Sequence, residues 1–337
     1  MHSEVTIPEW AAEVLCCPAD GGALTIASEG AACERCDRAY GVTDGILQLL
    51  PDRLAHLATT GAALEEAHEN QEQDVAWIED EMRWWDPWWE RMPTDPLSRH
   101  AGLRGRSRER HLLRHVRHRL PPDPLVVEMG AGSSRTVAGL WPPAEHGLRY
   151  VATDMSLPAL RAGRGIVGPG CAFVQCDAVE WPIREASADL VMILGVLHHL
   201  SDWRAALARA CRTVRPGGLM VLHEAVTKPR LLASRRPHGV DDGWVSPHEG
   251  DVPASELRAE LTRHGDILSW RGEESPLRFA LNRYLIERRR RSDLLERSRA
   301  LTATFDLLDQ VFGRTAGRVA PSLSFNEVNA VWQRPGR

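Results

Sequence analysis

The sequence has almost no lysine. Lys228 is the only one, so arginine supplies nearly all of the 41 basic residues. Acidic residues number 46 and the net charge is -5, which exerts no general attraction on nucleic acid. No apolar run reaches the roughly 18 residues of a membrane-spanning helix. The opening stretch "MHSEVTIPEW" also lacks the basic and apolar regions of a signal peptide. We therefore expect a cytoplasmic protein without a membrane contact.

Disulfide bonds are not expected either. The seven cysteines are an odd number for a disulfide framework and fit a reducing compartment. A chain of 337 residues is long enough for one large domain with an appendage, or for two domains.

Amino-acid composition and the pattern of apolar residues divide the chain into three parts. Residues 1–50 form a small module, rich in turn residues, that carries four of the seven cysteines. Residues 51–120 are polar and helical, with several prolines, and are predicted to be a connector and lid. Residues 121–337 alternate short apolar runs with helical stretches, and include a charged helical insertion at about 277–312.

This alternation predicts an α/β fold built on a parallel sheet. Strands are expected at 125–130, 149–154, 171–177, 188–195 and 218–225. An amphipathic helix lies between the last two, with Ser201 or Asp202 as its N-terminal cap. A helix at 253–265 and strands at 266–270 and 326–334 are expected to complete the domain.

The first of these strands runs into a glycine loop. Gly130 and Gly132 let the backbone approach a ligand at the start of a helix, but such a pair alone is a weak signal. A dinucleotide site would add a third glycine, where this chain has Ser133, Ser134 and Arg135. The next strands end in Asp154, which can accept hydrogen bonds from ribose hydroxyls, and in Asp177, which can accept from an adenine amino group. The missing glycine counts against a pyrophosphate, but the position of Asp154 is shared by nicotinamide and S-adenosylmethionine sites.

Four motifs in order, "VVEMGAGSS", "ATD", "CDAVEWPI" and "LHHL" through "RPGG", resemble those of class I methyltransferases that use S-adenosylmethionine (SAM). The resemblance covers about Leu125 to Ala225 and is closest to small-molecule and ubiquinone-type members. It implies a Rossmann-like fold and a set of cofactor contacts: Glu128, Gly130, Ala131 and Gly132 at the methionine end, Asp154 and Met155 at the ribose, Asp177 and Ala178 at the adenine, and Gly195 after the fourth strand.

Candidate proton acceptors follow the fourth and fifth strands. His198 and His199 come after the fourth strand, and His223 and Glu224 end the fifth, at the sheet edge where α/β sites lie. A hydroxyl acceptor needs a general base, for which histidine is suited near neutral pH. We expect His198, His199 or His223 to be catalytic and Glu224 to contact the acceptor, although a histidine of this motif can instead orient the loop.

Tryptophans crowd the segment "VAWIEDEMRWWDPWWERM", just before the catalytic part. Pro87 is expected to break a helix between the two tryptophan pairs. Trp85 and Trp88 are candidates to line a hydrophobic or aromatic acceptor pocket. The alternative is that they pack the lid onto the sheet or onto a second copy in a homodimer.

Cysteines in the first module suggest zinc. Cys33 and Cys36 are spaced as two thiolate ligands on one turn, and Cys17 and Asp20 stand where a second pair would be, with Cys16 as an outside candidate. The stretch from "LCCPADGGAL" to "CDRAYGVTDGILQLL" resembles the Trm112-like zinc ribbon, from which Asp20 departs.

The leading functional hypothesis is a SAM-dependent methyltransferase of a small-molecule, specialised-metabolite acceptor. A zinc ribbon before this catalytic fold also resembles ribosomal-RNA guanine methyltransferases, and the arginine-rich stretch 98–120 would then follow phosphates. The overall acidity argues against that reading, so a nucleic-acid partner is not expected. A third possibility is a non-catalytic partner protein that keeps the fold.

Overall fold

The computed structural model describes residues 7–58, 73–91, 112–113, 115–226, 252–273 and 327–336, together with residues 246, 248, 250 and 307. Nearly all of the helical insertion predicted at 277–312 lies outside this part of the chain. No described helix is long and apolar enough to cross a membrane.

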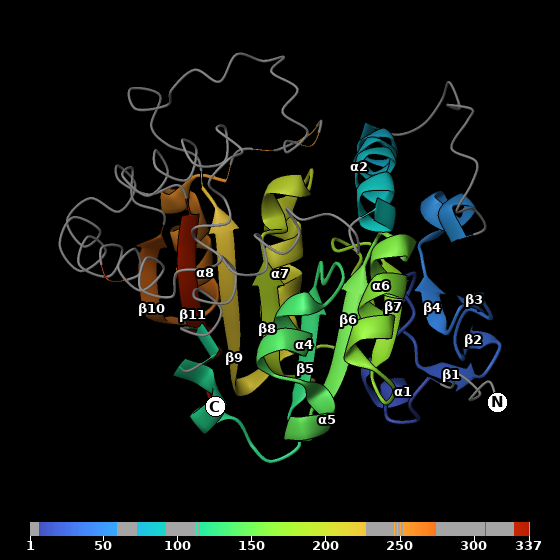
Figure 1. The fold of residues 1–337 in the computed structure, drawn as a ribbon, viewed down its shortest axis with the longest axis horizontal. Helices are drawn as coiled ribbons and strands as arrows, with labels where there is room; N and C mark the ends of the chain where they lie inside the picture. Colours follow the sequence, from blue (N-terminus) through green and yellow to red (C-terminus); the bar gives the residue numbers. More distant parts are fainter. Residues whose placement is uncertain are drawn as a thin grey trace.

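Eleven strands of the described chain form one sheet, in the order β1-β2-β3-β4-β7-β6-β5-β8-β9-β11-β10 (Figure 1). The first four come from the N-terminal module: β1 Leu24–Ala27, β2 Gly30–Cys33, β3 Ala39–Thr43 and β4 Ile46–Leu49. The others are β5 Leu125–Met129, β6 Arg149–Asp154, β7 Ala172–Cys176, β8 Ala188–Leu194, β9 Val214–Ala225, β10 Asp266–Glu273 and β11 Glu327–Gln333. All of the expected strands are present, within a few residues of their predicted bounds.

The centre of the sheet is parallel, from β4 through β7, β6, β5 and β8 to β9. Strand β11 then pairs antiparallel with β9, and β10 pairs antiparallel with β11. The strands β5 to β9 are apolar on both faces because helices cover both sides of the sheet. This Rossmann-like arrangement confirms the predicted α/β class.

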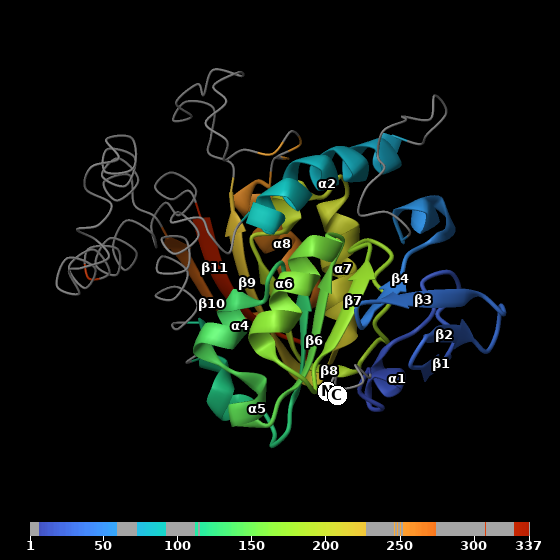
Figure 2. The same ribbon diagram turned by 45° about the vertical axis from the view of Figure 1, so that its right-hand side comes forward.

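Helices form a layer on each face of the sheet (Figures 1 and 2). One apolar core includes residues of α1 Ala11–Val14, α7 Trp203–Thr213 and α8 Ala254–His264. The core on the other face includes residues of α4 Arg135–Leu140 and α6 Leu157–Val167. Asp202 caps α7 by accepting a hydrogen bond from the Ala205 N–H, as one of the two caps predicted.

The N-terminal module is attached to the edge of the main sheet. Strand β4 pairs with β7, and its leucines Leu47 and Leu49 are completely buried. Burial of each leucine side chain stabilises this junction by about 1.5–3 kcal/mol. Buried side-chain amides add a polar contact, because Gln48 donates to Gln175 at 2.7 Å.

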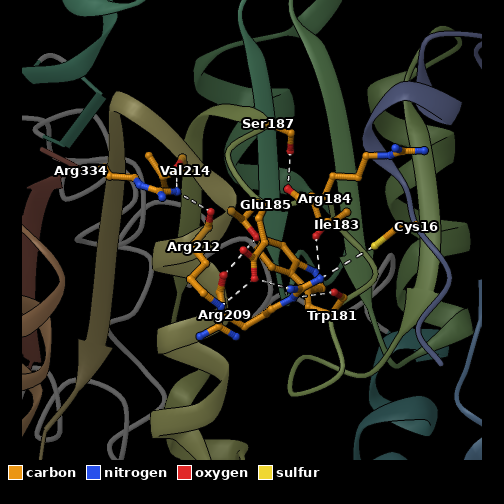
Figure 3. A network of polar contacts seen from close by, with 11 residues as sticks. Cys16, Trp181, Ile183, Arg184, Glu185, Ser187, Arg209, Arg212, Val214 and Arg334 are labelled. Atoms are coloured by element: carbon orange, nitrogen blue, oxygen red, sulfur yellow. Dashed lines mark hydrogen bonds and ion pairs between the residues drawn. The ribbon is translucent and has the colours of Figure 1, made fainter. Parts of the chain in front are cut away.

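A second junction joins the module to the segment between β7 and β8 (Figure 3). Arg209 of α7 donates to the carbonyls of Trp181 at 3.1 Å and Ile183 at 3.0 Å. The neighbouring Arg184 donates to the carbonyl of Leu15, which follows α1. These guanidinium groups donate to backbone carbonyls that accept no hydrogen bond within a strand or helix. The segment that leads to β8 is thereby fixed against the module.

Helix α2, Gln73–Arg91, crosses above the carboxyl ends of the strands (Figure 2). The prediction that Pro87 breaks this helix was wrong, because the helix continues through it. Proline removes one backbone hydrogen bond and crowds the carbonyl of Arg83. Packing of the tryptophan-rich face on the domain offsets that cost, which local sequence alone does not reveal.

Candidate active site and metal centre

The glycine loop after β5 has a left-handed backbone at both of its glycines. Gly130 and Gly132 have φ values of +65° and +51°, a region that favours glycine. A Cβ atom at Gly130 would come within 2.3 Å of the Val196 side chain. Ser134 also takes a left-handed conformation, with φ +51°, where it begins α4. The missing third glycine is therefore replaced by a serine that accepts this conformation.

Asp154 is tied directly to that loop. Its Oδ2 accepts a hydrogen bond from the Gly132 N–H at 2.8 Å, and its Oδ1 accepts from the Ser156 N–H at 2.8 Å. Burial raises the pKa of Asp154, and the two backbone donors oppose this shift. Met155, the next residue, packs against a small apolar cluster, named here the lid core, which consists of Leu50, Leu54, Leu57, Val75 and Met82. The carboxylate predicted to hold the ribose thus has a fixed orientation beside the glycine loop.

Glu128 lies below the loop rather than on it. It is buried, and the Tyr150 hydroxyl donates to it. The Tyr150 oxygen is also 3.1 Å from the Ser134 hydroxyl. Because one phenol connects Glu128 to Ser134, the acid supports the last turn of the glycine loop from inside the domain. No feature of the sequence indicated the role of Tyr150.

Asp177 follows β7 and is almost completely buried. Its Oδ1 accepts from the Val179 N–H at 3.0 Å, while Oδ2 accepts from Arg53, which the sequence reasoning did not single out. Ala178 is half-buried against the core. Gly195, at the end of β8, has φ +74°, and a Cβ there would meet nothing within 4 Å. Among the described residues, the space beside Gly195 is therefore open.

His198 and Glu224 form a buried acid–histidine pair. Glu224 is completely buried, and His198 Nδ1 bonds to its Oε1. The other carboxylate oxygen accepts from the Leu197 N–H at 2.7 Å and the Val196 N–H at 3.2 Å. Burial alone would raise the pKa of Glu224, but His198 and the Leu197 N–H outweigh it, so this pKa lies below its usual value. An ionised Glu224 can only accept, so Nδ1 carries a proton, and in the neutral ring the lone pair is on Nε2.

His199 faces the lid helix instead. Its Nδ1 is 3.2 Å from Glu81 Oε2, and its ring packs edge-on against Trp85 with centroids 5.2 Å apart. Glu81 also accepts from the Trp85 indole at 3.1 Å and from the His248 N–H at 3.0 Å. Burial opposes but does not overcome the effect of His199, so the pKa of Glu81 is lowered. His199 therefore fixes helix α2 against the loop after β8, through Glu81, which no motif predicted.

His223 precedes Glu224 in β9, and its side chain bonds to the neighbouring strand. Its Nδ1 is 2.9 Å from Asn329 Oδ1, and its Nε2 is 3.9 Å from Glu327. Both partners belong to β11, the neighbouring antiparallel strand. The structure thus brings together His198, His199 and Glu224, whereas the His223 side chain faces β11.

The tryptophans of α2 cover the glycine loop. Trp85 packs against Trp88 with centroids 5.4 Å apart, and Trp88 against Trp89 at 4.8 Å. The Trp89 ring lies so close to the loop that a Cβ at Gly132 would be 2.7 Å from it. Of the candidate acceptor residues, Trp85 contacts His199, and both Trp85 and Trp88 pack against Trp89, the ring that meets the loop.

A metal-ligand set lies in the N-terminal module. One donor atom from each of Cys17, Asp20, Cys33 and Cys36 falls within 4.8 Å of all the others. The Cys17 and Cys36 sulfurs are 3.7 Å apart. Two thiolates at 2.3 Å from a tetrahedral zinc would be separated by roughly 3.8 Å. Cys16, the outside candidate, is instead turned toward Arg209, 3.9 Å from its Nη2.

Gly22 makes this cluster sterically possible. A Cβ there would lie 2.8 Å from the Cys33 sulfur and 2.9 Å from Asp20 Oδ1. The Gly22 N–H also donates to Asp20 at 2.8 Å. Asp20, the departure from the four-cysteine pattern, is therefore oriented toward the cysteines, and the donor set fits zinc.

The part of the chain that carries the glycine loop and the two strand-end carboxylates is similar to known methyltransferase domains. Residues 127–222 match the family described as "Methyltransferase domain". This range begins in β5 and ends in β9, and it contains His198 but neither Glu224 nor any of the lid.

Curated relatives are similar over the same part of the chain. The demethylmenaquinone methyltransferase of Beutenbergia cavernae is 33% identical over 108 residues, which cover 32% of this chain and 43% of that protein. The 27-O-demethylrifamycin SV methyltransferase of Amycolatopsis mediterranei is 36% identical over 69 residues, 20% of this chain and 25% of that protein. The chain therefore spans less than half the length of these two relatives.

Solved structures with a similar fold extend further along the chain. A chain from the complex of the Haloferax volcanii Trm112 methyltransferase activator with a methyltransferase aligns with a TM-score of 0.49 and 16% identity, covering 73% of this chain and 97% of that one. Haemonchus contortus phosphoethanolamine N-methyltransferase 2 aligns with a TM-score of 0.46 and 17% identity, covering 67% and 53%.

Proposed function

We propose that this protein is a SAM-dependent methyltransferase that acts on a small-molecule acceptor, with His198 as its general base. The observation that carries the proposal is the convergence of the glycine loop, Asp154, Asp177 and the His198–Glu224 pair at one edge of the sheet. Bound SAM would supply an electrophilic methyl group. The residues of this chain would bind it, orient the acceptor and take up a proton.

The residues present fit this cofactor. Glycine at position 130 lets the loop pass against the Val196 side chain, and among the described residues the space beside Gly195 is open. Asp154 would hold the ribose, and Asp177 with Ala178 would hold the adenine. Gly130, Ala131 and Gly132 would receive the methionine end, with Glu128 supporting the loop from below and Met155 flanking the ribose.

The His198–Glu224 pair favours an acceptor whose nucleophile must lose a proton, such as a hydroxyl. His198 Nε2 would take that proton as the methyl group is transferred, and the buried Glu224 carboxylate would stabilise the resulting imidazolium. General bases of this kind contribute about 10²- to 10⁴-fold to the rate. Alignment of the acceptor with the methyl group supplies the remainder.

The lid helix supports a partly hydrophobic or aromatic acceptor. Trp85 and Trp88 pack on one another above the loop that contains His199, so an acceptor that reaches His198 would lie near indole rings. In the same protein, Cys17, Asp20, Cys33 and Cys36 would hold a structural zinc ion that fixes the module supplying β4.

The proposal is tested by incubating the full chain with methyl-labelled SAM and a metabolite extract, then separating small molecules, RNA and protein. Label in the small-molecule fraction, with an equal amount of S-adenosylhomocysteine, is the expected result. Label only in RNA would replace the proposal with RNA base methylation. SAM binding without transfer to any fraction would instead identify a non-catalytic protein.

A further inference from the structure

Arg53 connects the N-terminal part of the chain to the candidate adenine site. It belongs to the 3-10 helix η1, Asp52–Ala58, which follows β4. Its Nη2 is 2.5 Å from Asp177 Oδ2 and 2.9 Å from Glu180 Oε1. The Arg53 side chain is 25% exposed and that of Asp177 only 4%. Arg53 is therefore the basic partner of the carboxylate assigned to the adenine.

Sheet register explains how these two residues meet. Leu49 at the end of β4 is paired with Cys176 at the end of β7, so both strands leave the sheet at the same level. The chain then turns into η1, where Leu54 is completely buried in the lid core. Because Leu54 is fixed, the preceding Arg53 is held over the residue that follows Cys176.

The Arg53 guanidinium retains a hydrogen-bond donor without an acceptor. Its Nη1 is buried, and no residue in the described part of the chain accepts a hydrogen bond from it. A buried donor left unpaired is costly, and native proteins rarely keep one without a reason. An acceptor supplied by a ligand beside Asp177 would satisfy it.

An adenine ring presents the chemistry that this pair requires. Its exocyclic amino group is a donor, and each ring nitrogen next to that group, N1 and N7, is an acceptor. A carboxylate accepts and a guanidinium donates, so adjacent Asp177 and Arg53 groups complement a donor beside an acceptor. Each Asp177 oxygen has two lone pairs, so the Arg53 bond leaves capacity for the amino group.

We propose that Arg53 and Asp177 together read the adenine of the cofactor, with Asp177 accepting from the amino group and Arg53 Nη1 donating to a neighbouring ring nitrogen. This inference rests on the proposed use of SAM. It gives the segment after the N-terminal module a direct contact with the cofactor, and it makes Arg53 a binding residue outside the methyltransferase family match, which begins at residue 127.

The test measures equilibrium binding of S-adenosylhomocysteine and its 1-deaza, 3-deaza and 7-deaza analogues by calorimetry. Each analogue replaces one ring nitrogen with a C–H group. The wild-type chain should bind either the 1-deaza or the 7-deaza analogue about ten-fold more weakly than the parent compound, as expected for loss of one hydrogen bond to a charged group. The 3-deaza analogue controls for ring substitution away from the amino group.

Arg53→Met should bind the parent compound about ten-fold more weakly and should no longer distinguish it from the sensitive deaza analogue. Arg53→Lys keeps a charge beside Asp177 but lacks the guanidinium fork, so it should lose the same discrimination while remaining folded. Arg38→Met is the matched control. Arg38 also pairs with an acid near Arg53, because its Nη2 is 2.6 Å from Oδ2 of Asp52 in η1, but it does not contact Asp177.

Loss of affinity by the same factor for all four ligands in the Arg53 variants would overturn the inference, because it would show a structural role alone. Unchanged discrimination in Arg53→Lys would overturn it as well. Failure of the wild-type chain to bind S-adenosylhomocysteine would instead overturn the proposed function. The two failures are thus distinguishable.

Discussion

Glu224 and His198 are brought together from the ends of two adjacent parallel strands, and the buried carboxylate bonds to Nδ1 of the ring. The other oxygen of Glu224 is occupied by the backbone N–H groups of Val196 and Leu197. One acid therefore fixes both the loop that carries His198 and the tautomer of its ring.

Replacement of this acid by its amide is expected to switch that tautomer. In Glu224→Gln, the amide oxygen can still accept from Leu197 N–H, which turns the amide NH₂ toward His198 Nδ1. Nδ1 must then accept, so Nε2 carries the proton and cannot act as a base. We expect kcat to fall by about 10²-fold or more in Glu224→Gln and in His198→Asn.

The affinity for S-adenosylhomocysteine should stay within about two-fold of wild type in both variants, as binding calorimetry would show. His223→Asn is the matched control, because His223 contacts β11 and should retain most of the activity. Full activity of His198→Asn would contradict the base assignment and leave positioning as the source of catalysis.

Trp85 is expected to contribute to acceptor binding. Trp85→Ala removes the ring that packs against His199 and should raise KM for the acceptor found by labelling, by about ten-fold, without changing the affinity for S-adenosylhomocysteine. Trp85→Phe keeps an aromatic ring and loses only the bond to Glu81, so its effect should be smaller. An unchanged KM in Trp85→Ala would show that this tryptophan only packs the lid onto the sheet.

Zinc content is predicted to depend on Cys36 and not on Cys16. The purified chain should contain about one zinc ion, by elemental analysis, held by the tetrahedral donor set. Cys36→Ala should lose it, whereas Cys16→Ala should retain it because Cys16 faces Arg209. Asp20→Cys should slow release to a chelator, since thiolate is the preferred ligand of structural zinc. Equal zinc content in Cys36→Ala and wild type would rule out this site.

Asp86 should make the lid sensitive to pH. Burial, together with the nearby Asp154 and Glu90, raises the pKa of Asp86 from 3.8 to about 6, and Ser156 only partly opposes this. A raised pKa in an acid means that the folded chain holds the proton more tightly than the unfolded chain. The stability it contributes is present below pH 3.8 and is lost as pH rises through about 6.

Asp86→Asn keeps an oxygen for the Ser156 hydroxyl, which lies 2.5 Å from Asp86 Oδ1. It should therefore be more stable than wild type at pH 7.5, by about 2 kcal/mol, and no more stable at pH 4. Chemical denaturation at both pH values measures this difference. Asp74→Asn changes an exposed position on the same helix, and its stability relative to wild type should be nearly the same at both pH values. If the free energies of unfolding of Asp86→Asn and wild type differed by the same amount at both pH values, the raised pKa of Asp86 would be contradicted.

The sequence predicted the central sheet well because its strands are apolar runs separated by turn and cap signals, as at Asp202. The strand-end residues Asp154 and Asp177 could be found for the same reason, since each follows a recognisable strand. Their partners could not. Arg53 meets Asp177 only because β4 pairs with β7, and that register depends on contacts between distant parts of the chain.

The lid shows the same limit more strongly. Local propensity predicts a break at Pro87, yet tertiary packing keeps α2 continuous and places Glu81 against His199. The tryptophan cluster signalled a special surface but not which ring meets the glycine loop. That ring belongs to Trp89, rather than to Trp85 or Trp88.

The central claim is that the glycine loop and Asp154 form a SAM site, and binding of S-adenosylhomocysteine to the full chain tests it most directly. We predict a micromolar dissociation constant by calorimetry and a loss of at least about ten-fold in Asp154→Asn, which keeps the side-chain shape but removes the charge that accepts from ribose hydroxyls. Asp266→Asn, at the start of the edge strand β10, should bind like wild type. No measurable binding by the wild-type chain, or equal binding by wild type and Asp154→Asn, would contradict the account.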